Sequence, residues 1–208
     1  MIYFLKHLLH FPGVPYRYDQ LFAEVKKVRP KNIMEIGVWT GERARKMIGV
    51  ASRFHPKGSL HYYGFDLFES MDNEKFTKEV SKQPPTIKIV EEKLKKTRAN
   101  IHLYKGDTVM VLPDQEATLP KMDIVFIDGG HSLETIANDW FYVSKLLHQG
   151  SVVIFDDYWQ NRLDAGSKVT VDLIDKEEYS VVILPIIDSF PKTAFGHLSI
   201  QLAKVTKL

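Results

Sequence analysis

Carboxylates follow five apolar runs of this 208-residue chain, each at the point where a predicted strand ends. They are Glu35, Asp66, Asp107, Asp128 and the adjacent Asp156 and Asp157. Charge at a buried strand end is costly unless it is paired, hydrogen-bonded or metal-bound. A turn or capping role explains any one of them as well as a function does. The whole set, converging on one sheet edge, indicates a ligand site, because open α/β sheets bind ligands beyond the carboxyl ends of their strands.

The first of these carboxylates precedes a glycine turn, within the stretch NIMEIGVWTGERARK. Gly37 and Gly41 bracket the turn, and a helix is predicted over 41–49. Glycine lets the backbone approach a ligand, and a helix N-terminus presents free N–H groups. The pattern is E-x-G-x-x-x-G, not the G-x-G-x-x-G of dinucleotide enzymes. Glu35 would repel a pyrophosphate, so it suits a cationic or hydroxyl-bearing ligand.

Strands and helices alternate in the elements that must position these residues. Strands are predicted over 33–36, 60–65, 101–104, 122–127, 151–155, 179–185 and 197–205. Helices are predicted over 16–28, 41–49, 70–81, 86–98, 132–148 and 162–176, with a short helical turn over 108–112. The connection 186–196 carries no predicted helix, which favours an antiparallel final pair. The fold class is therefore α/β: a doubly wound, mostly parallel seven-stranded sheet with an antiparallel last strand and helices on both faces.

One domain spanning 1–208 is expected, with two additions to the sheet. Residues 1–30 form an N-terminal helical arm, whose apolar face packs on the domain or on a partner in preference to a membrane surface. Residues 67–100, between the second and third strands, form a helical cap near the ligand crevice. The apolar arm also allows a homodimer.

Bulk composition excludes several classes of function. A net charge of +2 gives no electrostatic case for nucleic acid as a partner. The chain has no cysteine, which removes disulfides, thiolate metal sites and cysteine nucleophiles and fits a reducing compartment. No apolar stretch is long enough to span a bilayer, and the N-terminus lacks the parts of a signal peptide. A cytoplasmic location is expected.

Two of the carboxylates stand where a nucleoside would be held. Asp66 is placed to accept hydrogen bonds from two ribose hydroxyls, as in nucleotide-binding α/β folds. Asp107, in KGD, could accept from an adenine amino group or cap the helical turn that follows. Trp39, inside the glycine turn, shapes a pocket wall or belongs to the core.

Five motifs in sequence order strengthen this interpretation: EIGVWTG, YGFDLFES, LYKGD, VFIDGGHSLE and VVIFDDY. Their order and spacing, from about residue 32 to residue 158, resemble those of class I S-adenosylmethionine-dependent methyltransferases. The chain looks most like small stand-alone methyltransferases with an IDGGHS-like fourth motif, which are related to macrocin O-methyltransferases. The resemblance implies a Rossmann-like fold and S-adenosylmethionine as cofactor.

The resemblance also implies a role for each matching position. Glu35, Gly37 and Gly41, with Val38 and Trp39 between the glycines, would contact the methionine end of the cofactor. Asp66 would hold the ribose and Asp107 the adenine, with Asp128 also beside the cofactor.

In the macrocin-like relatives, the aspartate after the fourth strand and the two after the fifth bind a divalent metal. The matching positions are Asp128, Asp156 and Asp157, and oxygen ligands of this kind suit Mg²⁺. Those relatives tend to have D-G-D-x-Y-x-S after the fourth strand, whereas this chain has DGGHS. Because the second acidic residue is missing, magnesium binding stays open.

His131 is the first candidate for a general base, since imidazole takes up a proton near neutral pH. Alternatively, it caps the following helix or bonds a strand end. Asp128 is a second candidate base, and His197 could approach the site from the last strand. Methyl transfer needs donor and acceptor in line about 3 Å apart and removal of the acceptor proton. The resemblance favours O-methylation of a small hydroxylated metabolite or a sugar.

The predicted cap 67–100 would select the acceptor. Its candidate lining residues are Phe68, Met71, Phe76, Lys88, Lys93, Lys95 and Lys96. For the lysines, a solvated helix face is the favoured explanation.

Two alternatives compete with a methyltransferase. One is a non-catalytic protein of the same fold that binds S-adenosylmethionine or a partner, which the intact carboxylates argue against. The other is an NAD-dependent oxidoreductase, which the missing G-x-G-x-x-G argues against.

Overall fold

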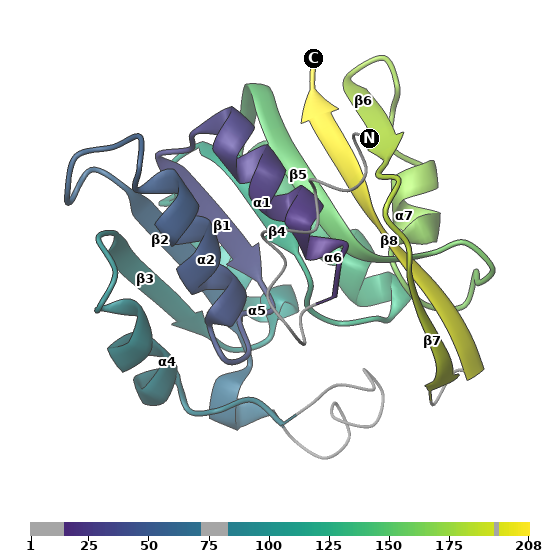
Figure 1. The fold of residues 1–208 in the computed structure, drawn as a ribbon, viewed down its shortest axis with the longest axis horizontal. Helices are drawn as coiled ribbons and strands as arrows, with labels where there is room; N and C mark the ends of the chain where they lie inside the picture. The colour runs from purple at the N-terminus through teal and green to yellow at the C-terminus, as the bar shows by residue number, and fades with distance from the viewer. Residues whose placement is uncertain (1–14, 72–82, 194–195) are drawn as a thin grey trace, which may run out of the picture.

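A single sheet organises the part of the chain that the computed structural model describes, residues 15–71, 83–193 and 196–208. Within these residues the strand order is β3-β2-β1-β4-β5-β8-β6, and β7 pairs with β8 off this path (Figure 1). The strands are β1 (Asn32–Ile36), β2 (His61–Asp66), β3 (Asn100–Lys105), β4 (Met122–Ile127), β5 (Leu147–Trp159), β6 (Tyr179–Ile183), β7 (Asp188–Thr193) and β8 (Gly196–Lys207). Neighbours from β3 to β5 are parallel, whereas β8 is antiparallel to β5 and β6.

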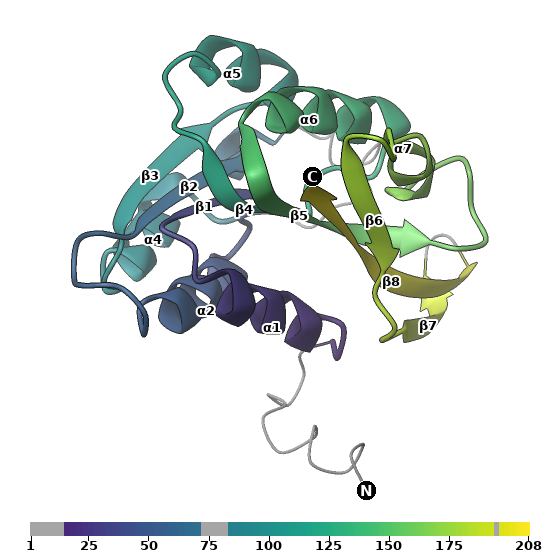
Figure 2. The same ribbon diagram turned by 90° about the horizontal axis from the view of Figure 1, so that it is seen from above.

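Helices cover both faces of this sheet. They are α1 (Tyr18–Val28), α2 (Glu42–Ala51), α4 (Ile87–Leu94), α5 (Thr108–Gln115), α6 (Leu133–Lys145) and α7 (Lys168–Asp172), with a 3-10 turn, η2, at Phe68–Ser70. Figure 2 shows α1 and α2 on one side of the sheet and α5, α6 and α7 on the other. None of the helices in the described ranges is long and apolar enough to cross a membrane.

Two hydrophobic clusters separated by the sheet form the core. In β4, Ile124 and Phe126 face the α1–α2 side, while Val125 and Ile127 face the α5–α6 side. This alternation, with both faces buried, is typical of a sheet covered by helices on each side. The predicted doubly wound α/β fold is confirmed.

Two segments differ from the sequence prediction. Strand β7 lies within the connection 186–196, and among the described residues it pairs with β8 alone. The sequence does not predict this strand, because the segment contains Pro191 and has no apolar run. The helix predicted over 162–176 is limited to α7, Lys168–Asp172. Gly166, with φ +82°, lies where an added Cβ would come within 2.6 Å of the Asp157 carbonyl oxygen, so the chain before α7 follows the end of β5 instead.

The segment predicted as a cap is described only in part, because 72–82, with Phe76, lies outside the described residues. Its described helix, α4, packs Val90 and Leu94 into the same core cluster as α1 and α2. This helix therefore covers the sheet face. Lys93 donates to the Thr40 carbonyl at 2.6 Å, while Lys88, Lys95 and Lys96 are exposed, as a solvated helix face requires. Of the arm 1–30, the described part is 15–30, which contains α1.

Candidate active site

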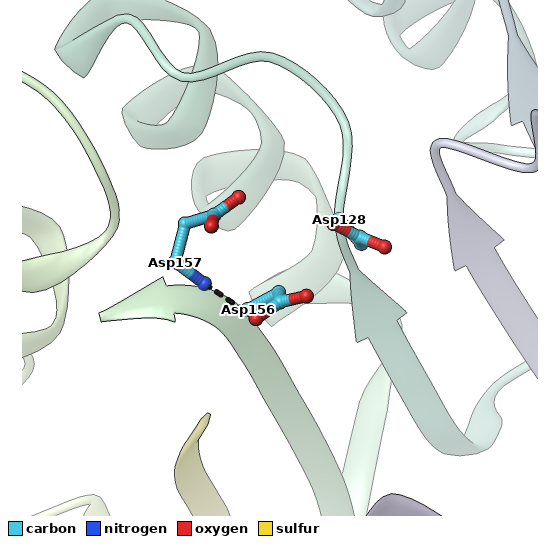
Figure 3. Close-up of side chains that lie close together, drawn as sticks. All are labelled: Asp128, Asp156 and Asp157. Atoms are coloured by element: carbon cyan, nitrogen blue, oxygen red, sulfur yellow. Dashed lines mark hydrogen bonds between the residues drawn. The ribbon is translucent and has the colours of Figure 1, made fainter. Parts of the chain in front are cut away.

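Carboxylates from the ends of β4 and β5 meet at one edge of the sheet. The two strands are parallel neighbours in which Ile127 pairs with Phe155, so Asp128 and Asp156 emerge side by side (Figure 3). With Asp157 they offer oxygen atoms that lie within 4.8 Å of one another. The same three residues line a small pocket together with Gly129, Gly130, Ile127, Ile136 and Ser167. The predicted convergence is therefore present for these positions.

Asp156 is the most fully bonded of the three. Its carboxylate accepts from Arg17 Nε at 2.7 Å, from Arg17 Nη2 at 2.9 Å and from the Tyr18 hydroxyl at 2.7 Å. The backbone N–H of Asp157 donates to it as well, at 2.8 Å. Burial favours the protonated acid, but the guanidinium and the hydrogen bonds outweigh it and lower the pKa of Asp156.

Asp128 and Glu35 share a second arginine. Arg43 Nη2, in the first turn of α2, lies 2.7 Å from Asp128 Oδ2, and its Nε lies 3.9 Å from Glu35 Oε1. Burial, strengthened by the nearby Asp156 and Asp157 carboxylates and opposed by Arg43, raises the pKa of Asp128. Burial also raises the pKa of Glu35 to about 7, against Arg43 and a hydrogen bond from the Tyr62 hydroxyl.

His131 pairs with the third carboxylate. Its Nε2 lies 3.0 Å from Asp157 Oδ2, and its ring stacks on Trp159 with 5.6 Å between centroids. Trp159 Nε1 donates to the other carboxylate oxygen, Asp157 Oδ1, at 3.2 Å. The residue that caps α6 is Ser132, whose Oγ accepts from Thr135 N. His131 thus does not cap the helix but contacts a strand-end carboxylate.

The glycine turn leaves no room for a side chain at its first position. A Cβ on Gly37, where φ is +90°, would lie 1.9 Å from the Asp128 carbonyl oxygen. Asp128 N donates to the Ile36 carbonyl at 2.8 Å, which fixes the turns after β1 and β4 against each other. Val38 is buried in the core, and Gly41, with φ +72°, precedes α2 as its N-cap. The turn thus brings backbone directly to the edge that carries the carboxylates.

Asp66 connects the glycine turn to the segment after β2. Its Oδ2 accepts from Trp39 N and its Oδ1 from Phe68 N, both at 2.7 Å. Both donors have left-handed backbones, with φ of 46° and 49°, which non-glycine residues adopt rarely. Burial raises the pKa of Asp66 in spite of these two bonds. Asp66 therefore holds two strained loops beside each other.

Asp107 and His197 have different surroundings. The Asp107 carboxylate accepts from Val109 N at 3.1 Å and caps α5, which confirms the capping alternative. Gly106 N donates to the Asp66 carbonyl, so Asp107 lies beside the end of β2. His197 is exposed near the start of β8, where its Nε2 lies 3.4 Å from Ser199 Oγ.

A family model described as "Methyltransferase domain" (Methyltransf_24) matches residues 34–158, which contain the glycine turn and all of the strand-end carboxylates. The chain belongs to this family. It is a methyltransferase, and the oxidoreductase alternative is wrong. The finer likeness to macrocin O-methyltransferases stays a prediction.

The chain is also similar to one protein in sequence and to solved structures in fold. The "uncharacterized protein R132" of Acanthamoeba polyphaga mimivirus is 30% identical over 155 residues, which are 65% of this chain and 70% of that protein. An O-methyltransferase from Bacillus cereus, solved with S-adenosylhomocysteine, has a TM-score of 0.67 at 16% identity, covering 99% of this chain and 89% of its own. TomG, an O-methyltransferase of tomaymycin synthesis from Streptomyces achromogenes, solved with S-adenosylmethionine, has a TM-score of 0.63 at 15% identity, covering 99% and 95%. At these identities the solved structures show the fold.

Five residues that contact the strand-end carboxylates or their partners were not predicted from the sequence. They are Arg17, Tyr18, Arg43, Tyr62 and Asp188, which holds Arg17. A signal for the arginines existed, because carboxylates predicted to be buried require nearby positive charge. Arg43, two residues after the second glycine of the turn, was the accessible candidate. Arg17 could not be identified from the sequence in this way, because its partners are supplied by β5 and β7.

Proposed function

We propose that this methyltransferase uses S-adenosylmethionine to methylate an oxygen of a small hydroxylated metabolite or a sugar. The observation that carries the proposal is the His131–Asp157 pair: His131 lies in the loop after β4, and the start of that loop, at Asp128 and Gly129, packs against the glycine turn. Imidazole oriented by a carboxylate is suited to removing a hydroxyl proton. The O-methyltransferases of similar fold, one solved with S-adenosylmethionine and one with S-adenosylhomocysteine, add support.

Asp66 would accept the ribose hydroxyls. Its oxygens accept the backbone N–H groups of Trp39 and Phe68, and an ionised carboxylate has about four lone-pair sites, so acceptor capacity remains. Asp107, next to it along the edge, would accept from the adenine amino group while capping α5.

The turn Gly37–Val38–Trp39 with Gly41 would lie along the methionine end of the cofactor. Asp128 would face its positive charge. Glu35 is fully buried and bonded to Tyr62, so we infer that it acts by holding Arg43 and the turn and does not touch the cofactor.

When bound, S-adenosylmethionine supplies a methyl group that is transferred from its sulfonium sulfur to an acceptor oxygen. His131 would take the proton that the acceptor hydroxyl loses. Because Asp157 holds Nε2, this proton transfer would use Nδ1 of the ring. Asp157 would orient the imidazole and stabilise its protonated form, and Trp159 would hold both groups by its stacking and its N–H. Asp128, whose pKa is raised, is the second candidate base.

The residues do not fit the divalent metal that the resemblance implies. Asp128, Asp156 and Asp157 do come together, but each already contacts a positively charged or protonatable side chain. Both oxygens of Asp156 accept from Arg17. No step is therefore assigned to magnesium.

An acceptor screen tests the proposal. Purified protein, S-adenosylmethionine and a panel of sugars and small hydroxylated compounds would be assayed for S-adenosylhomocysteine release and for the methylated product by mass spectrometry. We expect an O-methyl ether from at least one hydroxylated compound and its loss in His131→Gln. Methylation of nitrogen or carbon acceptors alone, or methylation of hydroxyls that His131→Gln leaves unchanged, would overturn the proposal.

A further inference from the structure

Three positively charged or protonatable groups of the chain itself contact the three carboxylates of the edge. Arg17 contacts Asp156, and Arg43 contacts Asp128 at 2.7 Å. His131 contacts Asp157 at 3.0 Å. The three groups belong to the start of α1, the first turn of α2 and the loop before α6. A cluster of acids that would otherwise attract a cation thus has counter-charges built in.

Arg17 is the most completely bonded of the three. Its Nε and one Nη2 hydrogen serve the two oxygens of Asp156, and the other Nη2 hydrogen bonds the Tyr18 hydroxyl at 3.0 Å. Its Nη1 donates to Asp188 Oδ2 at 3.2 Å. A guanidinium has five N–H donors in a planar fork, and four of them are used here. Arg17 and Asp156 thus form a bidentate ion pair, in which two guanidinium nitrogens bind the two carboxylate oxygens.

Asp188, at the start of β7, fixes the backbone that carries this arginine. Its two oxygens accept from the backbone N–H groups of Tyr16 and Arg17, each at 3.0 Å. Arg17, Asp156 and Asp188 are only 5%, 2% and 8% exposed. A buried ion pair is retained only where its geometry is well satisfied, and losing one partner leaves an uncompensated charge. The arginine is therefore a permanent part of the edge and not a surface side chain that happens to reach it.

We propose that Arg17 is the resident counter-ion of this site and holds both oxygens of Asp156, so that Asp156 does not join Asp128 and Asp157 in binding a divalent cation. This inference rests on the proposed function, in which this edge of the sheet is the methyl-transfer site. Arg17 makes its contacts to Asp156 and Asp188 and so acts as a positioning residue, holding the Asp156 carboxylate in place. The wild-type site binds no divalent metal, and removal of the guanidinium creates a metal site from Asp128, Asp156 and Asp157.

Manganese binding tests this, since Mn²⁺ prefers the same oxygen ligands as Mg²⁺ and is detected by electron paramagnetic resonance without any enzyme assay. Four proteins would be titrated with MnCl₂: the wild type, Arg17→Ala, Arg17→Ala with Asp156→Asn, and Arg45→Ala. Arg45 pairs with Glu42 on the exposed side of α2 and is the matched control for loss of an arginine. Circular dichroism and S-adenosylhomocysteine binding would be recorded for each protein.

We expect saturable Mn²⁺ binding only in Arg17→Ala, with a dissociation constant of about 0.1–1 mM, as for weak carboxylate sites. The wild type, Arg45→Ala and the double variant should show at least tenfold weaker binding. Saturable binding of one Mn²⁺ by the wild type that Asp157→Asn abolishes would overturn the proposal, as would folded Arg17→Ala that gains no binding. If Arg17→Ala does not fold, the wild-type titration still tests whether the native site binds a divalent metal. Failure of S-adenosylhomocysteine to bind would count against the proposed function and leave this readout unchanged.

Discussion

His131 Nε2 lies 3.0 Å from Asp157 Oδ2, which joins the loop after β4 to the end of β5. Asp157 reaches this position with a left-handed backbone, φ 54°. Ser167 N donates to its carbonyl at 2.9 Å, and Gly166 leaves room for that contact. Residues held in sparsely populated backbone regions persist where their surroundings determine them, often at functional sites. The backbone conformation and its hydrogen bonds thus hold the Asp157 carboxylate beside the His131 imidazole.

Removal of the imidazole should stop methyl transfer without weakening cofactor binding. We expect His131→Gln to lower kcat by about 10²–10⁴-fold, the usual contribution of a general base. Isothermal titration calorimetry should give an unchanged dissociation constant for S-adenosylhomocysteine. The matched control is His148→Gln, which removes a second histidine paired with an aspartate, His148 Nε2 to Asp123 Oδ1 at 3.0 Å, on the exposed surface. Equal losses of kcat in the two variants would contradict a role for His131 as base.

Loss of the carboxylate after β2 should weaken cofactor binding. We expect Asp66→Ala to raise the dissociation constant for S-adenosylhomocysteine by about 10–100-fold, because it removes a charged hydrogen-bond acceptor and releases the two loops that it holds. Titration calorimetry measures this directly. Asp164→Asn, at an exposed aspartate paired with Arg162, is the control and should bind like the wild type. Unaltered affinity in Asp66→Ala would remove Asp66 from the cofactor site.

Two glycines of the same region should respond to alanine in opposite directions. Gly37→Ala should lower the free energy of unfolding by at least about 3 kcal/mol, because its Cβ would collide with the Asp128 carbonyl in a left-handed backbone. Gly49→Ala, in the last turn of α2 with open space around the added Cβ, should raise it by about 0.5–1 kcal/mol. Urea unfolding of both proteins tests the pair. A Gly37→Ala variant as stable as the wild type would show that the turn is not packed as described.

The buried Glu35 should make stability depend on pH. Its pKa is about 7 in the folded protein against an ordinary value of 4.5, so the folded state keeps the proton longer than the unfolded state. Stability is therefore lost as the pH rises from about 4.5 to 7, by up to about 3 kcal/mol for this group. Asp128, whose pKa is also raised, contributes with the same sign.

Urea unfolding of the wild type and Glu35→Gln, at about pH 5 and about pH 8, measures this contribution. Glutamine can still accept from the Tyr62 hydroxyl but does not titrate. The loss of stability between the two pH values should be smaller in the variant. Identical pH dependences would mean that Glu35 is ionised at pH 5 in the folded protein.

The sequence predicts the strands and the acidic edge well because both depend on local patterns. Nearly continuous apolar runs such as 122–127 identify strands that are buried on both faces, and parallel strands bring their carboxyl ends together without further information. The Arg17–Asp156 contact joins residues 139 positions apart, and Arg17–Asp188 joins residues 171 apart. Contacts of this kind depend on how α1 packs and on β7, which has no apolar pattern of its own. The role of Arg17 therefore became visible only in the structure.

Calorimetric titration of the wild-type protein with S-adenosylhomocysteine, with NAD⁺ titrated in parallel, measures whether the site binds the expected cofactor. We predict saturable binding of one S-adenosylhomocysteine per chain with a dissociation constant of about 1–100 µM, no binding of NAD⁺, and loss of the signal in Asp66→Ala. Absence of any S-adenosylhomocysteine binding at millimolar concentration by folded protein would contradict the account.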